Sequence, residues 1–183
     1  MVKIYKTTIQ KFEYLAKWIF IPAIIIFAVT GSVKAQNVNV TATVGTAAAT
    51  YNTLKKAFDE INAGTHQGVI TIDIAISTDE GTTPAVLNSN TADPASYTSI
   101  YIKPSATNIV VTGNPAAGFG VIELNGADNV TIDGSFNGTS SRDLTINNTG
   151  TTTNLANSCI RVATSAVVNS ADNLTIKNCI ING

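Results

Sequence analysis

Apolar and polar residues alternate strictly in one stretch near the middle of the chain. From Val69 to Ile76, isoleucine occupies every second position and Val, Thr, Asp and Ala lie between. A period of two predicts a half-buried β-strand. Similar short runs bounded by turn-forming residues follow at 97–103, 108–112 and 121–124, and Pro104 is expected to stop the first of these. The pattern predicts a protein built mainly of short strands.

One segment has helical spacing instead. Its apolar residues recur three or four positions apart, at Tyr51, Leu54, Phe58 and Ile61. This spacing places them in one stripe and predicts an amphipathic helix over 51–61. Thr50 is expected to cap its start, and Gly64 to end it as a left-handed residue. The stripe has to be buried, and the strands that follow offer the surface for it.

The first 35 residues have the pattern of an export signal. Four lysines and a single acid, Glu13, precede an uncharged apolar run from Trp18 to Thr30. The run fits an h-region of about 7–15 residues and falls short of the roughly 20 that a spanning helix needs. The small residues Val33 and Ala35 suit a signal peptidase. We therefore expect a signal peptide over 1–35 and a mature chain from Gln36, with an uncleaved N-terminal anchor as the alternative.

Removal of this segment changes the charge balance. Residues 36–183 contain six basic and eleven acidic side chains, a net charge of −5. No basic cluster remains, so neither nucleic acid nor an acidic membrane surface is an expected partner. The 148 residues suffice for one domain with a sizeable core.

A phrase recurs in the last third of the chain. Ala127–Ile132 returns 44 positions later as Ala171–Ile176, and a shorter echo lies between them at Asp143–Ile146. Each full copy is an Asp-Asn turn pair that leads into a three-residue strand. Recurrent turn-plus-strand units predict a parallel β-helix, in which coils stack and like residues stack on like. A β-sandwich is the alternative, because it also uses many short strands.

The helix phrase 50–64, the Ile-Thr-Ile strand after it and the phrase 124–134 resemble the N-terminal region of large secreted proteins of Bacteroidota. Those proteins are similar to the pectin-lyase-like, right-handed parallel β-helix class, and they often carry a C-terminal sorting domain for type IX secretion. The resemblance implies a right-handed β-helix whose open N-terminal end is capped by the helix. It covers roughly residues 37–183. The chain ends within a strand-like repeat at Ile180–Gly183 with no sorting domain, so we expect residues 36–183 to be the cap and first coils of a longer protein.

Acidic residues are the first candidates for chemistry, because polysaccharide enzymes use carboxylates as acid, base or calcium ligand. Asp128 and Asp172 occupy equivalent places in the repeat and are expected to stack, yet both fit the role of turn residues, as does Asp133. Asp79 and Glu80 are expected in a solvated loop. We assign no catalytic residue.

The remaining reactive side chains are few. His66 is the single histidine and has no second ligand nearby, so no metal site and no cofactor are expected. Cys159 and Cys179 either form a disulfide or remain as buried thiols. The Asn-x-Thr triplets at Asn39, Asn129, Asn137, Asn147 and Asn173 follow from an Asn- and Thr-rich composition.

Two functions remain open. The first is a non-catalytic secreted or cell-surface β-helix module that acts in adhesion or contacts carbohydrate through Thr, Asn and Ser. The second is the N-terminal part of a polysaccharide lyase or glycoside hydrolase with its catalytic coils beyond residue 183. An enzyme needs carboxylates, or Arg and Lys with carboxylates, on adjacent coils. Arg142 and Arg161 are present without an evident cluster.

The export prediction has a direct test. N-terminal sequencing of the exported protein is expected to begin at or near Gln36, because the lysine-rich start, the apolar run and Ala35 together form a cleavable signal. A mature chain that still begins at Met1 and stays in the inner membrane would contradict it.

Overall fold

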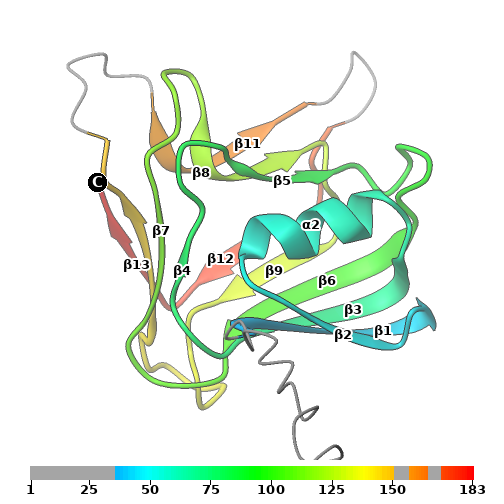
Figure 1. Ribbon diagram of the computed structural model, residues 1–183, viewed down its shortest axis with the longest axis horizontal. Helices are drawn as coiled ribbons and strands as arrows, with labels where there is room; N and C mark the ends of the chain where they lie inside the picture. The colour runs from blue at the N-terminus through cyan, green and yellow to red at the C-terminus, as the bar shows by residue number, and fades with distance from the viewer. Residues whose placement is uncertain (1–35, 151–156, 165–169) are drawn as a thin grey trace, which may run out of the picture. The chain divides into compact units, whose positions relative to one another are not determined.

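The structure is a computed structural model that describes residues 36–150, 157–164 and 170–183. The predicted signal peptide, residues 1–35, lies outside these ranges. The described part is mostly β, with a single helix, α2, at Leu54–Asn62. Figure 1 shows the strands arranged as three sheets around a common interior, with α2 lying across one end of it.

The strands form sheets of six, four and three members. The six-stranded sheet has the order β2–β1–β3–β6–β9–β12, with bounds Ala48–Tyr51, Val38–Gly45, His66–Ile74, Tyr97–Pro104, Val130–Asp133 and Thr175–Lys177. The second has the order β4–β7–β10–β13, with bounds Thr78–Asp79, Ile109–Gly113, Leu144–Asn148 and Cys179–Asn182. The third has the order β5–β8–β11, with bounds Ala85–Asn88, Gly120–Asn125 and Ser158–Ala163.

From β3 to β10, each strand pairs with the strand three places later in the chain, and every such pair is parallel. The chain therefore visits the three sheets in a fixed order and then returns to the first. We call one such passage a circuit. The antiparallel pairs are those of β1 with β2 and with β3. Parallel pairing differs from the antiparallel pairing of a β-sandwich, the alternative that the sequence left open.

The interior is filled by aliphatic side chains that align between circuits. Ile72 pairs with Ile102, and Ile102 pairs with Ile132. All three are fully buried, and burying such a side chain contributes about 1.5–3 kcal/mol. The alternation predicted for Val69–Ile76 is confirmed for its isoleucines up to Ile74. It fails at Ile76, which lies beyond the end of β3 and is 49% exposed.

The repeated phrases lie directly on one another, as a stacked repeat requires. Thr131 and Ile132 pair with Thr175 and Ile176, their counterparts 44 positions later. The shorter echo at Asp143–Ile146 belongs to a different sheet, because Leu144–Asn148 is β10. The 44-residue spacing is therefore the length of one circuit at this place.

Asparagine side chains join successive circuits, one pair at a turn and one pair within paired strands. The amide of Asn173 donates to Oδ1 of Asn129 at 3.1 Å, and the amide of Asn182 donates to Oδ1 of Asn147 at 2.7 Å. Asn129 and Asn173 both have a positive φ, near 57° and 55°, a conformation that asparagine tolerates better than most residues. At Asn129 and Asn173 the residue that makes the turn also bonds its counterpart on the next circuit, whereas Asn147 and Asn182 do so from within β10 and β13.

The helix is shorter at its start than the apolar spacing predicted. It begins at Leu54, and its N-cap is Thr53, whose hydroxyl accepts a hydrogen bond from the backbone N–H of Lys56 at 3.1 Å. The prediction of Tyr51 in the helix and Thr50 as its cap is wrong, because β2 pairs Ala48–Tyr51 with β1. The predicted end is confirmed, since Gly64 follows the helix with φ of 73°.

A buried carboxylate completes the helix N-terminus. The two oxygens of Glu80 accept hydrogen bonds from the backbone N–H groups of Leu54, at 3.1 Å, and Lys55, at 2.7 Å. These two donors have no partner within the helix, and a negative charge at this end is favourable. The expectation of a solvated Glu80 is wrong: it is 7% exposed, and burial raises its pKa.

Helix α2 and β1 cover the first circuit. β1 pairs with the outer edge of β3. Along β5, the side chain of Asn62 donates to the carbonyl of Val86 at 2.8 Å and accepts from the backbone N–H of Asn88 at 3.0 Å. Asn62 thereby supplies the bonds that a neighbouring strand would make, which protects an edge that is otherwise open to aggregation.

The packing of α2 yields a stability prediction. Phe58 lies on the inward face of α2 and is fully buried. Phe58→Asp places a charge there without a partner, so the variant is expected to be less stable than the parent by several kcal/mol. Chemical denaturation measures the change in the free energy of unfolding.

Lys55→Asp is the matched control on the same helix. It removes the partly exposed pair of Lys55 with Asp59, so a loss of about 1 kcal/mol or less is expected. Equal stability of the Phe58→Asp variant and the parent would mean that the buried face of α2 is misassigned.

Candidate functional site

The outward face of the six-stranded sheet carries a row of hydroxyl groups. Thr71, Tyr101, Thr131 and Thr175 pair in register across β3, β6, β9 and β12. Their neighbours in sequence, such as Ile72 and Ile132, point into the core, so the alternation of the strands turns this row outward. Thr175 is exposed and the other three are partly exposed. We call these four residues the hydroxyl row.

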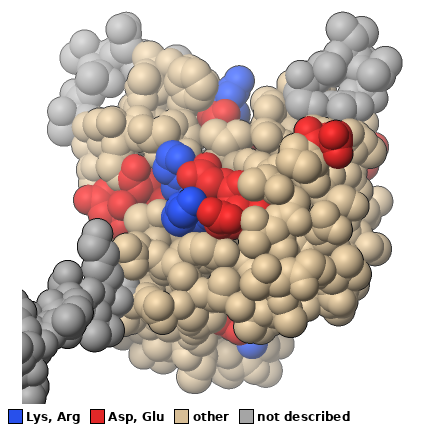
Figure 2. All heavy atoms as spheres, turned by 45° about the vertical axis from the view of Figure 1, so that its right-hand side comes forward, with Lys and Arg blue, Asp and Glu red and all other residues tan. Residues whose placement is uncertain are grey.

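Charged residues beside the hydroxyl row occur as pairs of opposite sign. Lys103 lies 3.6 Å from Asp73, and Lys177 lies 3.1 Å from Asp133, each on a neighbouring strand. In the view of Figure 2, most of the surface is neither acidic nor basic, and the basic side chains lie directly beside acidic ones. This arrangement suits a neutral polar ligand better than a strongly charged one.

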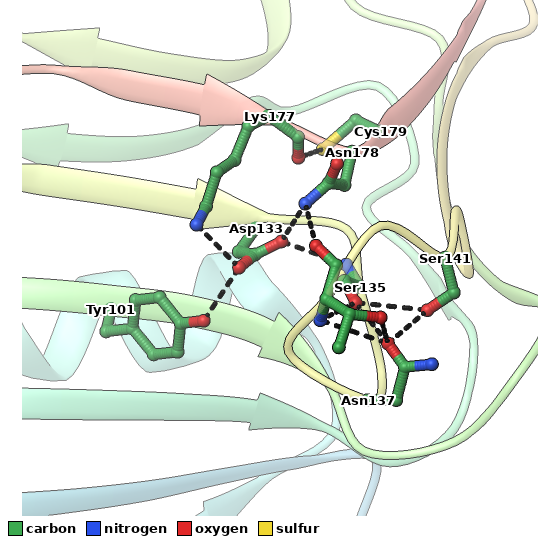
Figure 3. A network of polar contacts seen from close by, with 9 residues as sticks. Tyr101, Asp133, Ser135, Asn137, Ser141, Lys177, Asn178 and Cys179 are labelled. Carbon is green, nitrogen blue, oxygen red and sulfur yellow. Dashed lines mark hydrogen bonds and ion pairs between the residues drawn. The ribbon is translucent and has the colours of Figure 1, made fainter.

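Asp133 is the most constrained polar group of the site. It is 1% exposed, and four donors surround its carboxylate (Figure 3). Oδ1 accepts from the backbone N–H of Ser135 at 3.1 Å and from the amide of Asn178 at 2.9 Å. Oδ2 accepts from the hydroxyl of Tyr101 at 2.9 Å and lies 3.1 Å from Nζ of Lys177. The sequence predicted a turn residue, and the Ser135 bond is of that kind, but the carboxylate also joins three strands.

These contacts fix the charge of Asp133. Burial by itself raises the pKa of its carboxyl group, but the bonds from Asn178, Lys177 and Tyr101 and from the Ser135 backbone outweigh it and lower the pKa from 3.8 to about 2. The pKa of Tyr101 is raised by burial and by its bond to Asp133. A carboxylate with such a low pKa and four donors is a poor general acid or base near neutral pH.

A polar loop continues from Asp133 to Asp143. Its side chains gather around one atom, Oδ1 of Asn137, which accepts hydrogen bonds from the hydroxyls of Ser135 and Ser141 at 2.8 Å and 2.9 Å. Thr139 adds its hydroxyl at 2.6 Å and its backbone N–H at 3.1 Å. Figure 3 shows the labelled residues of this loop next to Asp133.

Asp128 and Asp172 are brought together, as the repeat predicts. The backbone N–H of Asp172 donates to Oδ1 of Asp128 at 2.8 Å. Asp128 thus bonds the backbone of the next circuit as well as occupying a turn. Asp79 remains exposed, and its carboxylate accepts from the backbone N–H of Gly81 at 2.9 Å, a local turn contact.

His66 is a structural residue at the start of β3. It is fully buried, and its Nδ1 lies 2.7 Å from the carbonyl oxygen of Thr46 while its Nε2 lies 2.7 Å from the hydroxyl of Tyr51. The carbonyl can only accept, so Nδ1 carries a proton and donates to it, and Nε2 shares a hydrogen bond with the Tyr51 hydroxyl. Both ring nitrogens are therefore engaged, one with the turn between β1 and β2 and the other with β2.

The two arginines have separate structural partners. Arg161 lies 2.8 Å from Glu123, whose side chain is 5% exposed and also accepts from the backbone N–H of Gly120 at 2.7 Å. Arg142 donates to the carbonyl oxygen of Cys179 at 2.7 Å. The Arg161–Glu123 pair joins β8 to β11, a contact that no sequence pattern around Glu123 indicates.

The structure holds both cysteines as free, buried thiols. Cys159 donates to the carbonyl oxygen of Asn182 at 3.0 Å, and Cys179 donates to that of Lys177 at 3.2 Å. Burial raises the pKa of the Cys179 thiol. A thiol of raised pKa is a poor nucleophile and a poor metal ligand.

The described residues contain neither a metal-binding cluster nor a membrane-spanning helix. Within residues 36–150, 157–164 and 170–183, no three His, Cys, Asp or Glu side chains are grouped so that they could bind a metal. In the same part of the chain, no helix has the length and apolar character needed to cross a membrane.

The chain matches no protein-family model, no curated protein and no solved structure.

Tyr101, Lys177 and Asn178 are members of the site that sequence reasoning missed. The repeat contains a signal for one of them, since Asp133 and Lys177 are 44 positions apart and pair across β9 and β12. Extending the aligned phrase by one residue places them opposite each other. Nothing local to Tyr101 indicates that its hydroxyl reaches Asp133, 32 positions away.

The lowered pKa of Asp133 predicts a pH dependence of stability. The ionised group stabilises the fold fully above pH 3.8, and this contribution is lost as the pH falls through about 2. A shift of this size corresponds to about 2 kcal/mol. The free energy of unfolding of Asp133→Asn is therefore expected to lie furthest below that of the parent at neutral pH, with the gap narrowing in acid.

Asp172→Asn is the control, since Asp172 is exposed and its carboxylate accepts from the neighbouring Ser170. It is expected to change stability little at any pH. A gap between parent and Asp133→Asn that stays constant from pH 7 to pH 2 would show that ionisation of Asp133 does not stabilise the fold. Denaturant titrations at several pH values supply the measurement.

Proposed function

We propose that residues 36–183 form a right-handed parallel β-helix whose N-terminal end is capped by α2. The pairing of every third strand, the in-register repeat and the helix across one end all support this architecture. Right-handedness follows from the strong general preference for right-handed connections between parallel strands of one sheet.

We further propose that the protein is exported and acts at the cell surface or outside the cell, as a non-catalytic module that contacts neutral glycans. The hydroxyl row is the observation that carries this proposal. It presents Thr71, Tyr101, Thr131 and Thr175 at regular intervals along one face. The threonine hydroxyls can donate hydrogen bonds to sugar hydroxyls and accept them, whereas the Tyr101 hydroxyl donates to Asp133 and is left to accept. The neighbouring charges are paired, so they neither attract nor repel a neutral ligand strongly.

The state of the acidic groups supports a non-catalytic role. General acid–base chemistry needs a group with a pKa near the working pH and free access to the substrate. Asp133 has a pKa of about 2 and Glu80 caps a helix, so both carboxylates are already engaged. The net charge of −5 over residues 36–183 also disfavours the approach of polyanionic glycans.

Binding to soluble neutral glucans, mannans and xylans tests the proposal, measured by affinity electrophoresis and calorimetry. The triple variant Thr71→Val, Thr131→Val, Thr175→Val keeps side-chain shape and removes three hydroxyls. At 0.5–1.5 kcal/mol per hydrogen bond, its affinity is expected to fall roughly tenfold or more. Pectin and alginate are expected to remain uncut.

Thr82→Val with Thr83→Val is the matched control, because it removes two hydroxyls from an exposed loop away from the hydroxyl row. It should bind as the parent does. Absence of binding to every neutral glycan, or equal binding by the triple variant, would reject the glycan role. Cleavage of pectin or alginate that disappears in Asp133→Asn with the fold intact would instead make the protein an enzyme.

A further inference from the structure

The loop after β9 contains an Asn-Gly pair in a distinctive setting. Four hydrogen-bond donors converge on Oδ1 of Asn137, supplied by the hydroxyls of Ser135, Thr139 and Ser141 and by the backbone N–H of Thr139. An amide oxygen has two lone pairs. The Ser141 hydroxyl has the Ser135 hydroxyl and the Asp143 carboxylate as competing partners. The other three donors alone exceed the two lone pairs, a setting that suits an oxygen with a full negative charge better than a neutral amide oxygen (Figure 3).

We propose that Asn137 is a site of spontaneous deamidation that its own loop promotes. The backbone nitrogen of Gly138 loses its proton to hydroxide and attacks Cγ of Asn137, which places the negative charge on Oδ1. The intermediate collapses with cleavage of the Cγ–Nδ2 bond, the departing nitrogen takes up a proton from water, and ammonia leaves a succinimide ring. Water then opens the ring to aspartate or isoaspartate. No oxidant or reductant takes part.

The converging donors favour attack on Cγ of Asn137, the electrophilic carbon. Hydrogen-bond donors that are already placed around an oxygen stabilise the negative charge that develops on it in a tetrahedral intermediate. The hydroxyls of Ser135, Thr139 and Ser141 lie within 2.6–2.9 Å of Oδ1 before the reaction starts. The loop therefore favours the step that forms the ring.

The attacking nitrogen is accessible. Asn137 and Gly138 are both exposed. Gly138 has a φ of 71°, and no heavy atom lies within 4 Å of the position where a Cβ would stand. The bond from the N–H of Thr139 to Oδ1 closes an Asx turn, which folds the Asn137 side chain back over the Gly138 peptide. Cγ and the Gly138 nitrogen are thereby held on the same side of the turn.

A second Asn-Gly pair provides a comparison within the same molecule. Gly126 follows Asn125, but Gly126 is buried and its N–H donates to the carbonyl oxygen of Ala163 at 2.7 Å, on the next circuit. The Gly126 nitrogen would have to break this hydrogen bond before it could attack Cγ of Asn125. The two pairs have the same dipeptide sequence but different surroundings. The structure therefore predicts that Asn137 deamidates faster than Asn125.

The product fits the same loop. A carboxylate at position 137 accepts hydrogen bonds more strongly than an amide oxygen does, and the four donors already point to it. Conversion to aspartate thus adds one negative charge at an exposed loop beside Phe136, which is 45% exposed. This inference is independent of the proposed glycan role.

The test follows deamidation of the purified, folded protein at neutral and mildly alkaline pH. Peptide mapping by mass spectrometry detects the mass gain that accompanies exchange of an amide for a carboxyl group. The peptide with Asn137 is expected to convert well before the peptide with Asn125. In denaturant the two pairs are expected to convert at similar rates, because only the dipeptide sequence then matters.

Removal of single donors tests the role of the loop. Ser141→Ala and Thr139→Val each delete one hydroxyl, and each is expected to slow conversion of Asn137 roughly two- to tenfold, the range equivalent to one hydrogen bond. Ser170→Ala, which removes an exposed hydroxyl elsewhere, is expected to leave the rate unchanged. Circular dichroism confirms that each variant is folded.

Two results would overturn the inference. The first is conversion of Asn137 no faster than that of Asn125 in the folded protein. The second is faster conversion in Ser141→Ala and Thr139→Val, which would mean that the four hydrogen bonds restrain Asn137 rather than activate it.

Discussion

Alignment of aliphatic side chains between successive circuits is the constraint on which the rest of the structure depends. Ile72, Ile102 and Ile132 lie in register and are fully buried, and each covers the apolar surface of the next. A single circuit has no second layer to bury its inner face, so stability comes from neighbours. Because a shift of one residue would turn every side chain to the opposite face, the same alignment fixes which polar groups point outward.

The start of such a stack needs its own solution, because a first circuit has an exposed edge in every sheet. The protein covers it with two kinds of structure. β1 adds an antiparallel strand along β3, and α2 lies across the interior with Asn62 bonded along β5. Burial of Glu80 opposes its ionisation, and the two bonds it accepts from the start of α2 offset part of that cost.

Polar side chains cross-link the outward face for a related reason. Side chains that stack in register also bond in register, so Asp133 finds Tyr101 on one neighbouring strand and Lys177 on the other. Its low pKa and its four donors make the carboxylate a structural joint. The reactive potential of this region lies instead in the adjoining loop, where the donors around Asn137 surround a neutral oxygen. Hydroxyl groups in register beside a carboxylate that is fully engaged suit ligand binding better than acid–base catalysis.

The sequence by itself determined the features that depend on local periodicity. Three features can be read directly from the spacing of residues along the chain. They are the alternation through Ile74, the apolar stripe of Leu54, Phe58 and Ile61, and the 44-residue repeat. The parallel pairing of every third strand, the burial of Glu80 and the union of Asp133 with Tyr101 were decided by the tertiary structure. So was the fate of Tyr51, which pairs in β2 and bonds His66 instead of starting the helix. The physical reason is that these contacts join residues tens of positions apart, and their partners are set by the register of whole circuits.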